Sequence, residues 1–113
     1  MTSPPNGTKV LTILMTAPDA GEGERIVSAL LDERLIACGN LVPGVVSLFR
    51  WEGAVRRDDE VLVILKSVAD RIPRLLERAA ELHPYDVPEL LVLPVVDGSG
   101  AYLDWVEQEC REG

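Results

Sequence analysis

The chain has 113 residues, 47% of them hydrophobic, and a formal net charge of −8. This length and hydrophobic content predict one domain whose core needs no disulfide or structural metal. The negative charge argues against nucleic acid as a partner, because such binding needs clustered Lys and Arg. No basic leader or long apolar run is present, so we expect no membrane association and a cytoplasmic protein.

Two cysteines, Cys38 and Cys110, lie far apart and outside any C-x-x-C spacing. The sequence therefore carries neither a zinc knuckle nor a thioredoxin motif, and we expect both thiols to be reduced.

The first part of the chain predicts a strand and a helix, after a flexible N-terminal tail over residues 1–8. Residues 10–16 are an apolar run typical of a strand. Asp19 is placed to cap a helix, with Glu22 three residues later to complete a capping box. Apolar residues then recur at helical spacing, so the helix is expected to end near Cys38, where Gly39 can stop it.

A hairpin with long arms is predicted next. Residues 41–51 indicate a strand interrupted at Pro43-Gly44, and Glu52-Gly53 makes the turn into a returning strand that reaches Leu65. Residues 56–60 are all charged, which we interpret as a solvated part of the returning strand or as an edge protected against mispairing.

The last part of the chain predicts a helix, a strand and a second helix. Asp70 can cap the first of these, with Pro73 in its first turn, and apolar residues follow at helical spacing. Residues 88–96 are an apolar strand, residues 97–100 are a turn, and residues 101–110 are a short helix.

The predicted order, over residues 9–113, is βαββαβ followed by a C-terminal helix. This order indicates an α+β fold, the ferredoxin-like split βαβ sandwich. Right-handed crossovers place both connecting helices on one face of the sheet and leave the other face bare. Residues 61–65 and 90–93 are apolar at both alternating positions, so both faces need cover, and we expect a homo-oligomer.

The only histidine of the chain stands in the segment His83-Pro84-Tyr85-Asp86-Val87-Pro88-Glu89. Proline pushes the residue before it toward extended geometry, so His83 and Val87 are predicted to be extended and the segment to be a stiff connector. Such a connector can present an imidazole, a phenol and two carboxylates in fixed positions, or it can be only a turn.

Several short motifs follow one another from the first predicted strand to the last helix. They are Thr16-Ala17-Pro18-Asp19, Glu33-Arg34-Leu35-Ile36-Ala37-Cys38, Pro43-Gly44, Trp51-Glu52-Gly53, Ile64-Leu65-Lys66, the connector from His83 to Glu89, and Tyr102-Leu103-Asp104-Trp105. Together they closely resemble the CutA divalent-cation tolerance family, and only the N-terminal tail lies outside the resemblance.

The resemblance implies a trimer of ferredoxin-like subunits whose sheets pack against one another, with an architecture similar to the PII signalling proteins. It also implies a role in tolerance of copper and other divalent cations, with no established enzymatic activity. We therefore expect a non-enzymatic homotrimer that responds to divalent metal ions and binds copper(II) or another divalent cation weakly. No organic cofactor is expected, and the sequence identifies no partner protein.

The predicted copper ligands are His83, Cys38 and Met15, which carry an imidazole and two sulfur donors. Copper prefers imidazole and sulfur ligands. Copper-binding members of the family resemble this chain at Cys38 and His83, but some carry Cys at the position of Met15 and a second His at that of Leu82. These differences remove donors, so a complete site needs symmetry-related copies, carboxylates or water.

Each candidate ligand also has a purely structural interpretation. The ring of His83 can hydrogen-bond the backbone of the connector, Cys38 can be a small buried residue at a helix end, and Met15 can pack in the core. A nucleophilic pair of Cys38 and His83 would need an orienting group and an oxyanion hole, and no motif around Cys38 announces either.

Other residues allow less specific interpretations. Trp51, Tyr102 and Trp105 can line a ligand cleft or a subunit interface, and we favour the interface. Paired carboxylates can work in acid–base catalysis, although solvated charges are commoner; the candidates are Glu52, Glu60, Asp86 and Glu89. The alternative function is PII-like sensing of a nucleotide or another small molecule, but neither a P-loop nor G-x-G-x-x-G is present.

Overall fold

The computed structural model describes residues 8–111. The elements are β1 (Val10–Ala17), α1 (Ala20–Asp32), β2 (Cys38–Trp51), β3 (Ala54–Val68), the 3-10 turn η1 (Ala69–Arg71), α2 (Ile72–Leu82), β4 (Leu91–Pro94) and α3 (Gly100–Glu109). Of the predicted tail over residues 1–8, only Thr8 lies within the described residues. Its N–H donates to the Val95 carbonyl at 3.0 Å, so Thr8 belongs to the domain.

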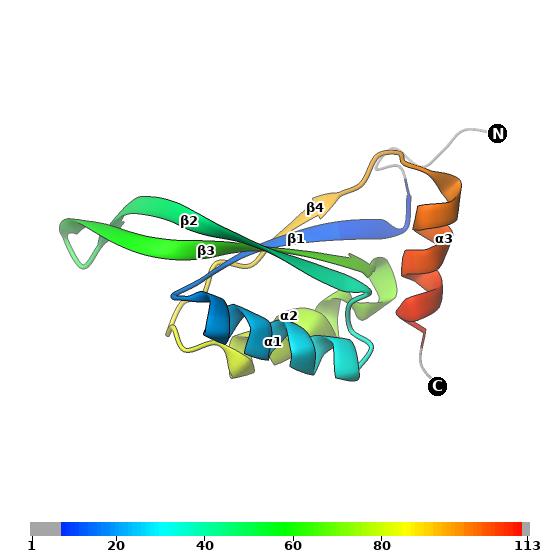
Figure 1. Ribbon diagram of the computed structural model, residues 1–113, viewed down its shortest axis with the longest axis horizontal. Coiled ribbons are helices and arrows are strands. Elements are labelled where there is room, and N and C mark those ends of the chain that lie inside the picture. Colours follow the sequence, from blue (N-terminus) through cyan, green and yellow to red (C-terminus); the bar gives the residue numbers. More distant parts are fainter. Residues whose placement is uncertain (1–7, 112–113) are drawn as a thin grey trace.

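The strands form one antiparallel sheet in the order β2-β3-β1-β4. Helices α1 and α2 lie together on one face of this sheet, and α3 packs across one end (Figure 1). The predicted βαββαβ order with a C-terminal helix is therefore confirmed. The main core lies between the sheet and these two helices, where the largest fully buried side chains include Ile13, Met15, Ile26, Leu30, Val63, Leu65 and Leu75.

Helix α1 begins as predicted but ends earlier than predicted. Asp19 is its N-cap, and the Asp19 carboxylate accepts from the Glu22 N–H at 2.8 Å. The expected end near Cys38 is wrong, because Arg34 has a φ of 56° and closes a Schellman motif. In this motif the N–H groups of Arg34 and Leu35 donate to the carbonyls of Leu31 and Leu30.

Two further boundaries differ from the prediction. Asp70 does not cap α2: it lies in η1, and α2 has Arg71 at its N-cap with no side-chain cap. Pro73 lies in the first turn of α2, as predicted. Strand β4 is only four residues long and therefore shorter than the predicted strand over residues 88–96. The backbone on either side of β4 is irregular.

The hairpin of β2 and β3 extends well beyond the rest of the sheet. The last β1–β3 pair is Ala17–Val61, whereas β2 and β3 stay paired as far as Trp51–Ala54 (Figure 1). The register shifts between Val42 and Val45, at the predicted interruption. Glu52 and Gly53 have φ values of 50° and 80°, which is a type I′ turn and matches the twist of the two strands. We call the part beyond Ala17–Val61 the hairpin arm.

The face of the sheet opposite α1 and α2 is apolar and uncovered within the chain. The strand register places Leu14 of β1, Leu62 and Ile64 of β3, Val42 of β2 and Leu91 of β4 side by side on this face. Val42 is 42% exposed and Leu91 is 53% exposed. The prediction that apolar residues occupy both sides of these strands is confirmed, and we call this surface the open face.

Candidate functional site

The connector between α2 and β4 is fixed to the sheet by His83. His83 is extended, with φ −76° and ψ 138°, as its position before Pro84 predicts. Its Nε2 lies 2.7 Å from the carbonyl oxygen of Thr16, and its Nδ1 accepts from the N–H of Tyr85 at 3.1 Å. A carbonyl only accepts and an N–H only donates, so these contacts define the neutral Nε2–H tautomer. Both ring nitrogens of this buried histidine are therefore in use.

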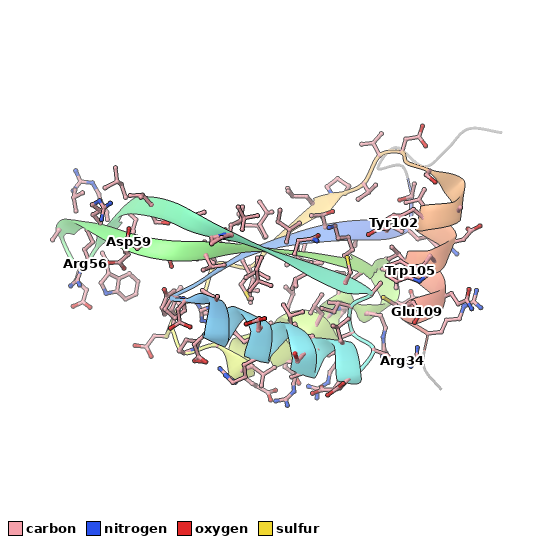
Figure 2. The ribbon with its side chains drawn as sticks, viewed as in Figure 1. Arg34, Arg56, Asp59, Tyr102, Trp105 and Glu109 are labelled. Carbon is pink, nitrogen blue, oxygen red and sulfur yellow. The ribbon has the colours of Figure 1, made fainter. Side chains whose placement is uncertain are left out.

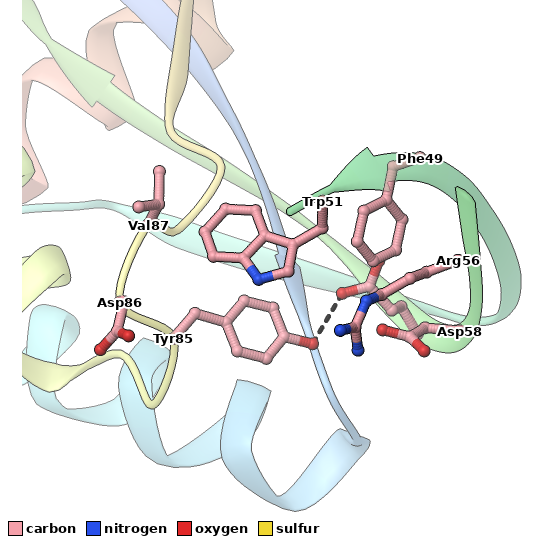
Figure 3. Close-up of a pocket in the computed structure, with 8 residues that line it drawn as sticks. Phe49, Trp51, Arg56, Asp58, Tyr85, Asp86 and Val87 are labelled. Carbon is pink, nitrogen blue, oxygen red and sulfur yellow. Dashed lines mark hydrogen bonds between the residues drawn. The ribbon is translucent and has the colours of Figure 1, made fainter. Parts of the chain in front are cut away.

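Tyr85 joins the connector to the base of the hairpin arm. Its ring lies against the ring of His83, with centroids 4.7 Å apart. Its hydroxyl donates to Oε2 of Glu60 at 2.7 Å (Figure 3). Burial, and then the hydrogen bond to Glu60, raise the pKa of Tyr85 above its ordinary value. The phenol therefore stays neutral and acts as a donor to a carboxylate that is itself only 8% exposed.

A cavity of about 250 Å³ opens between the arm and the connector. In Figure 3 the indole of Trp51 faces the ring of Tyr85, and Phe49 stands two residues before Trp51 in β2. The wall from β2 and β3 and the wall from the connector meet through the Tyr85–Glu60 hydrogen bond. The lining residues are Phe49, Trp51, Arg56, Asp58, Glu60, Tyr85, Asp86 and Val87.

Sequence reasoning found only part of this site. It singled out Trp51, Glu60 and Asp86, but it paired none of them with Tyr85. The other two predicted carboxylates, Glu52 and Glu89, are not among the lining residues. Glu60 stands 25 positions before Tyr85, and no local pattern links a strand residue to a connector at that distance. The alternation along β3 could have indicated that Arg56, Asp58 and Glu60 share a side of the arm.

Met15 and Cys38 lie on opposite faces of the sheet. Met15 pairs with Val63 and is fully buried beneath the helices, where it packs in the main core. Cys38 pairs with Lys66, whose neighbour in β1 is Thr12, and this row belongs to the open face. The sheet therefore separates the two sulfur atoms.

Cys38 begins β2 and is half-buried, rather than buried at a helix end. Its sulfur lies 3.5 Å from the hydroxyl of Tyr102 in α3. This hydrogen bond, with burial as a smaller cause, raises the pKa of Tyr102 to about 12. Tyr102 and Trp105 pack ring against ring, with centroids 5.6 Å apart, and both remain 42% exposed (Figure 2). Their predicted role at a subunit interface stays a prediction.

Within one chain, the three candidate copper ligands do not come together. The row of Cys38 meets β1 at Thr12, whereas His83 bonds Thr16, four residues or about 13 Å farther along the strand. Among residues 8–111, no group of three or more His, Cys, Asp or Glu side chains could hold a metal ion. Donors from a single copy therefore do not fit copper, and the metal site over His83, Cys38 and Met15 stays a prediction that needs further copies.

The comparisons with known proteins agree with this fold over almost the whole chain. Residues 11–109 match the model of the family described as CutA1 divalent ion tolerance protein. The chain belongs to this family. It is 44% identical over 96 residues to the divalent-cation tolerance protein CutA of Thermus thermophilus, and this alignment covers 85% of this chain and 93% of that protein. The corresponding protein of Pectobacterium atrosepticum is also 44% identical, over 89% of this chain and 92% of its own length.

Solved structures of CutA proteins share the fold. The CutA structure from Xylella fastidiosa superposes with a TM-score of 0.90 at 35% identity, covering 92% of this chain and 100% of that one. The family connects the chain to tolerance of divalent cations in general. No helix in the described part of this CutA chain has the length and apolar character needed to cross a membrane.

Proposed function

We propose that the chain acts as a homotrimer, without enzymatic activity, in the response to divalent metal ions. Its membership of the divalent ion tolerance family supports the metal response. The trimer is what the resemblance to CutA implies, and the observation that carries it here is the open face. Both cysteines are free thiols, which supports a reducing, cytoplasmic location; fractionation of cells into cytoplasm and envelope tests this.

The open face supports assembly because its apolar side chains have no cover within the chain. Val42, Leu91 and Leu93 are each at least 42% exposed there. A contiguous apolar surface of this kind is unfavourable in water and marks a protein–protein contact. Copies of the same chain are the simplest partners.

Weak binding of copper(II) or another divalent cation fits this assembly. Cys38 stands in a row of the open face, so the contact between copies would bring its soft thiol close to donors of another chain. His83 could serve as a ligand only by giving up its bonds to Thr16 and Tyr85. That loss offsets much of the metal binding, so the affinity is expected to be low.

Calorimetric titration of the purified protein with copper(II) tests the metal site. Replacing Cys38 by Ala is expected to weaken copper binding, because it removes the soft donor. Cys110→Ala is the matched control, since the Cys110 thiol is buried and burial raises its pKa. Undiminished copper binding in both Cys38→Ala and His83→Ala would eliminate the proposed site.

The second candidate, PII-like sensing of a small molecule, is supported by the cavity beside Tyr85. Its lining includes three carboxylates, Asp58, Glu60 and Asp86, which disfavour a polyphosphate such as a nucleotide. Thermal shift with ATP, ADP and cyclic nucleotides separates the two candidates, because a ligand that binds the folded state raises the melting temperature. We expect no shift with the nucleotides.

A further inference from the structure

The cavity between the hairpin arm and the connector has features that select a ligand class, independently of any metal site. The first feature is a buried carboxylate. Glu60 is only 8% exposed, yet it lines the cavity. Tyr85 donates to its Oε2, and no described residue donates a hydrogen bond to Oε1. No side-chain oxygen of the described residues is both fully buried and without a partner, so Oε1 is open to the cavity and can accept a hydrogen bond from a ligand.

The second feature is the charge around the cavity. The lining includes three carboxylates, those of Asp58, Glu60 and Asp86, and one guanidinium, that of Arg56. Three negative charges and one positive charge leave a formal charge of −2, within a chain whose net charge is already −8. The field at the cavity therefore attracts cations and repels anions.

The third feature is the aromatic lining. Trp51 and Tyr85 face each other across the cavity and Phe49 extends the same wall, so that three ring systems border one space (Figure 3). The face of an aromatic ring attracts an organic cation and also packs against alkyl groups. Small hydrated metal ions make no use of such a surface. The cation that fits has an alkyl part.

The size of the cavity limits the ligand. Its volume of about 250 Å³ equals the space of about eight water molecules in the liquid, so the ligand has only a handful of heavy atoms. The free oxygen of Glu60 accepts hydrogen bonds, which a primary ammonium group can donate and a quaternary ammonium group cannot.

From these observations we propose that the cavity binds small aliphatic amines in their ammonium form. The ammonium group donates to Oε1 of Glu60, near the carboxylate of Asp58, and the alkyl chain packs between Trp51 and Tyr85. The hydroxyl of Tyr85 holds the Glu60 carboxylate in place for this contact. The residues come from the arm and the connector of one chain, so the site does not depend on the metal response.

The proposal is tested by calorimetry and ligand-observed NMR on the full-length protein, with n-butylammonium as the probe. The neutral 1-butanol has nearly the same shape and lacks the charge, tetramethylammonium has the charge and lacks N–H groups, and inorganic phosphate reports any anion site. The variants are Glu60→Gln and Asp58→Asn, with Glu24→Gln as the control, because Glu24 is an exposed carboxylate on α1 outside the cavity. Gln at position 60 can still accept from Tyr85, and Asp58 is exposed, so both variants should fold.

We expect n-butylammonium to bind more tightly than both tetramethylammonium and 1-butanol, and phosphate not to bind. Glu60→Gln should weaken n-butylammonium binding by about tenfold or more, the effect of losing one charge-assisted hydrogen bond. Asp58→Asn should weaken it less, and Glu24→Gln should leave it unchanged. Equal binding of n-butylammonium and 1-butanol, no binding of either, or full binding by Glu60→Gln would each overturn the proposal, whatever the protein does with metals.

Discussion

The role of His83 can be tested by removing its ring from the metal-free protein. His83 is 7% exposed, and its ring bridges the carbonyl of Thr16 and the N–H of Tyr85. His83→Ala leaves both backbone groups without their partner and opens a cavity at the end of β1. With about 1–3 kcal/mol for each unsatisfied group, and the lower end applying where water can enter, we expect a loss of about 2–4 kcal/mol in the free energy of unfolding.

Two conservative variants separate the two hydrogen bonds. His83→Asn places an acceptor near the position of Nδ1 and can retain the bond from Tyr85, whereas His83→Gln reaches toward Thr16. Each should recover about 1 kcal/mol of the loss seen with Ala. The assay is guanidinium unfolding in the presence of EDTA, at one protein concentration because an oligomer's stability depends on it. Glu89→Ala, an exposed change in the same connector, is the control.

A ligand role gives the opposite pattern for His83. If His83 served only to bind metal, His83→Ala would unfold in EDTA at the same guanidinium concentration as the unmodified protein. A difference below about 0.5 kcal/mol, the range of ordinary surface substitutions, would refute the reasoning from the two hydrogen bonds.

Three further predictions follow from single residues. Met15→Ala should lower the free energy of unfolding by about 2–5 kcal/mol and Met15→Leu by less than about 1.5 kcal/mol, because Met15 fills the core. Copper binding by Met15→Leu should equal that of the unmodified protein, and weaker binding would show that the sulfur is a ligand. Asp19→Ala should lower the free energy of unfolding by about 1 kcal/mol, since it removes the cap of α1, and an unchanged value would exclude that role. Tyr85 has a pKa above its ordinary 10.0 in the folded state, so its contribution is complete below pH 10 and declines as the pH rises beyond it. Between about pH 9 and 11, the free energy of unfolding should therefore fall more for the unmodified protein than for Tyr85→Phe. Equal decreases in the two proteins would contradict the burial of the phenol.

Patterns that act over a few residues were readable from the sequence. The N-cap at Asp19, the Glu52-Gly53 turn and the interruption at Pro43-Gly44 all depend on neighbouring residues, and each was found where it was expected. The predicted return contact from Glu22, which would complete a capping box, was not found, because the Glu22 carboxylate pairs with Arg25. The uncovered apolar face also followed from composition, because residues 61–65 are apolar at every position.

Features set by tertiary contacts were not readable in this way. The Schellman motif that ends α1 has Arg34 at the position where glycine is usual, so the sequence pointed to Gly39 as the residue that stops the helix. This error placed Cys38 at the end of a helix instead of in a strand. The alternation of strand side chains between the two faces of the sheet, which places Cys38 and Met15 on opposite faces, could therefore not be applied. The Tyr85–Glu60 bond depends on where the connector crosses the arm, which is decided by packing rather than by local sequence.

The central claim is that copies of the chain assemble and share a weak metal site, and native mass spectrometry of the untagged protein with and without copper(II) tests it most directly. The account predicts the mass of a trimer that gains a whole number of copper ions, with less uptake by Cys38→Ala. A monomer would contradict the role given to the open face. A trimer with no defined copper uptake would contradict the shared metal site.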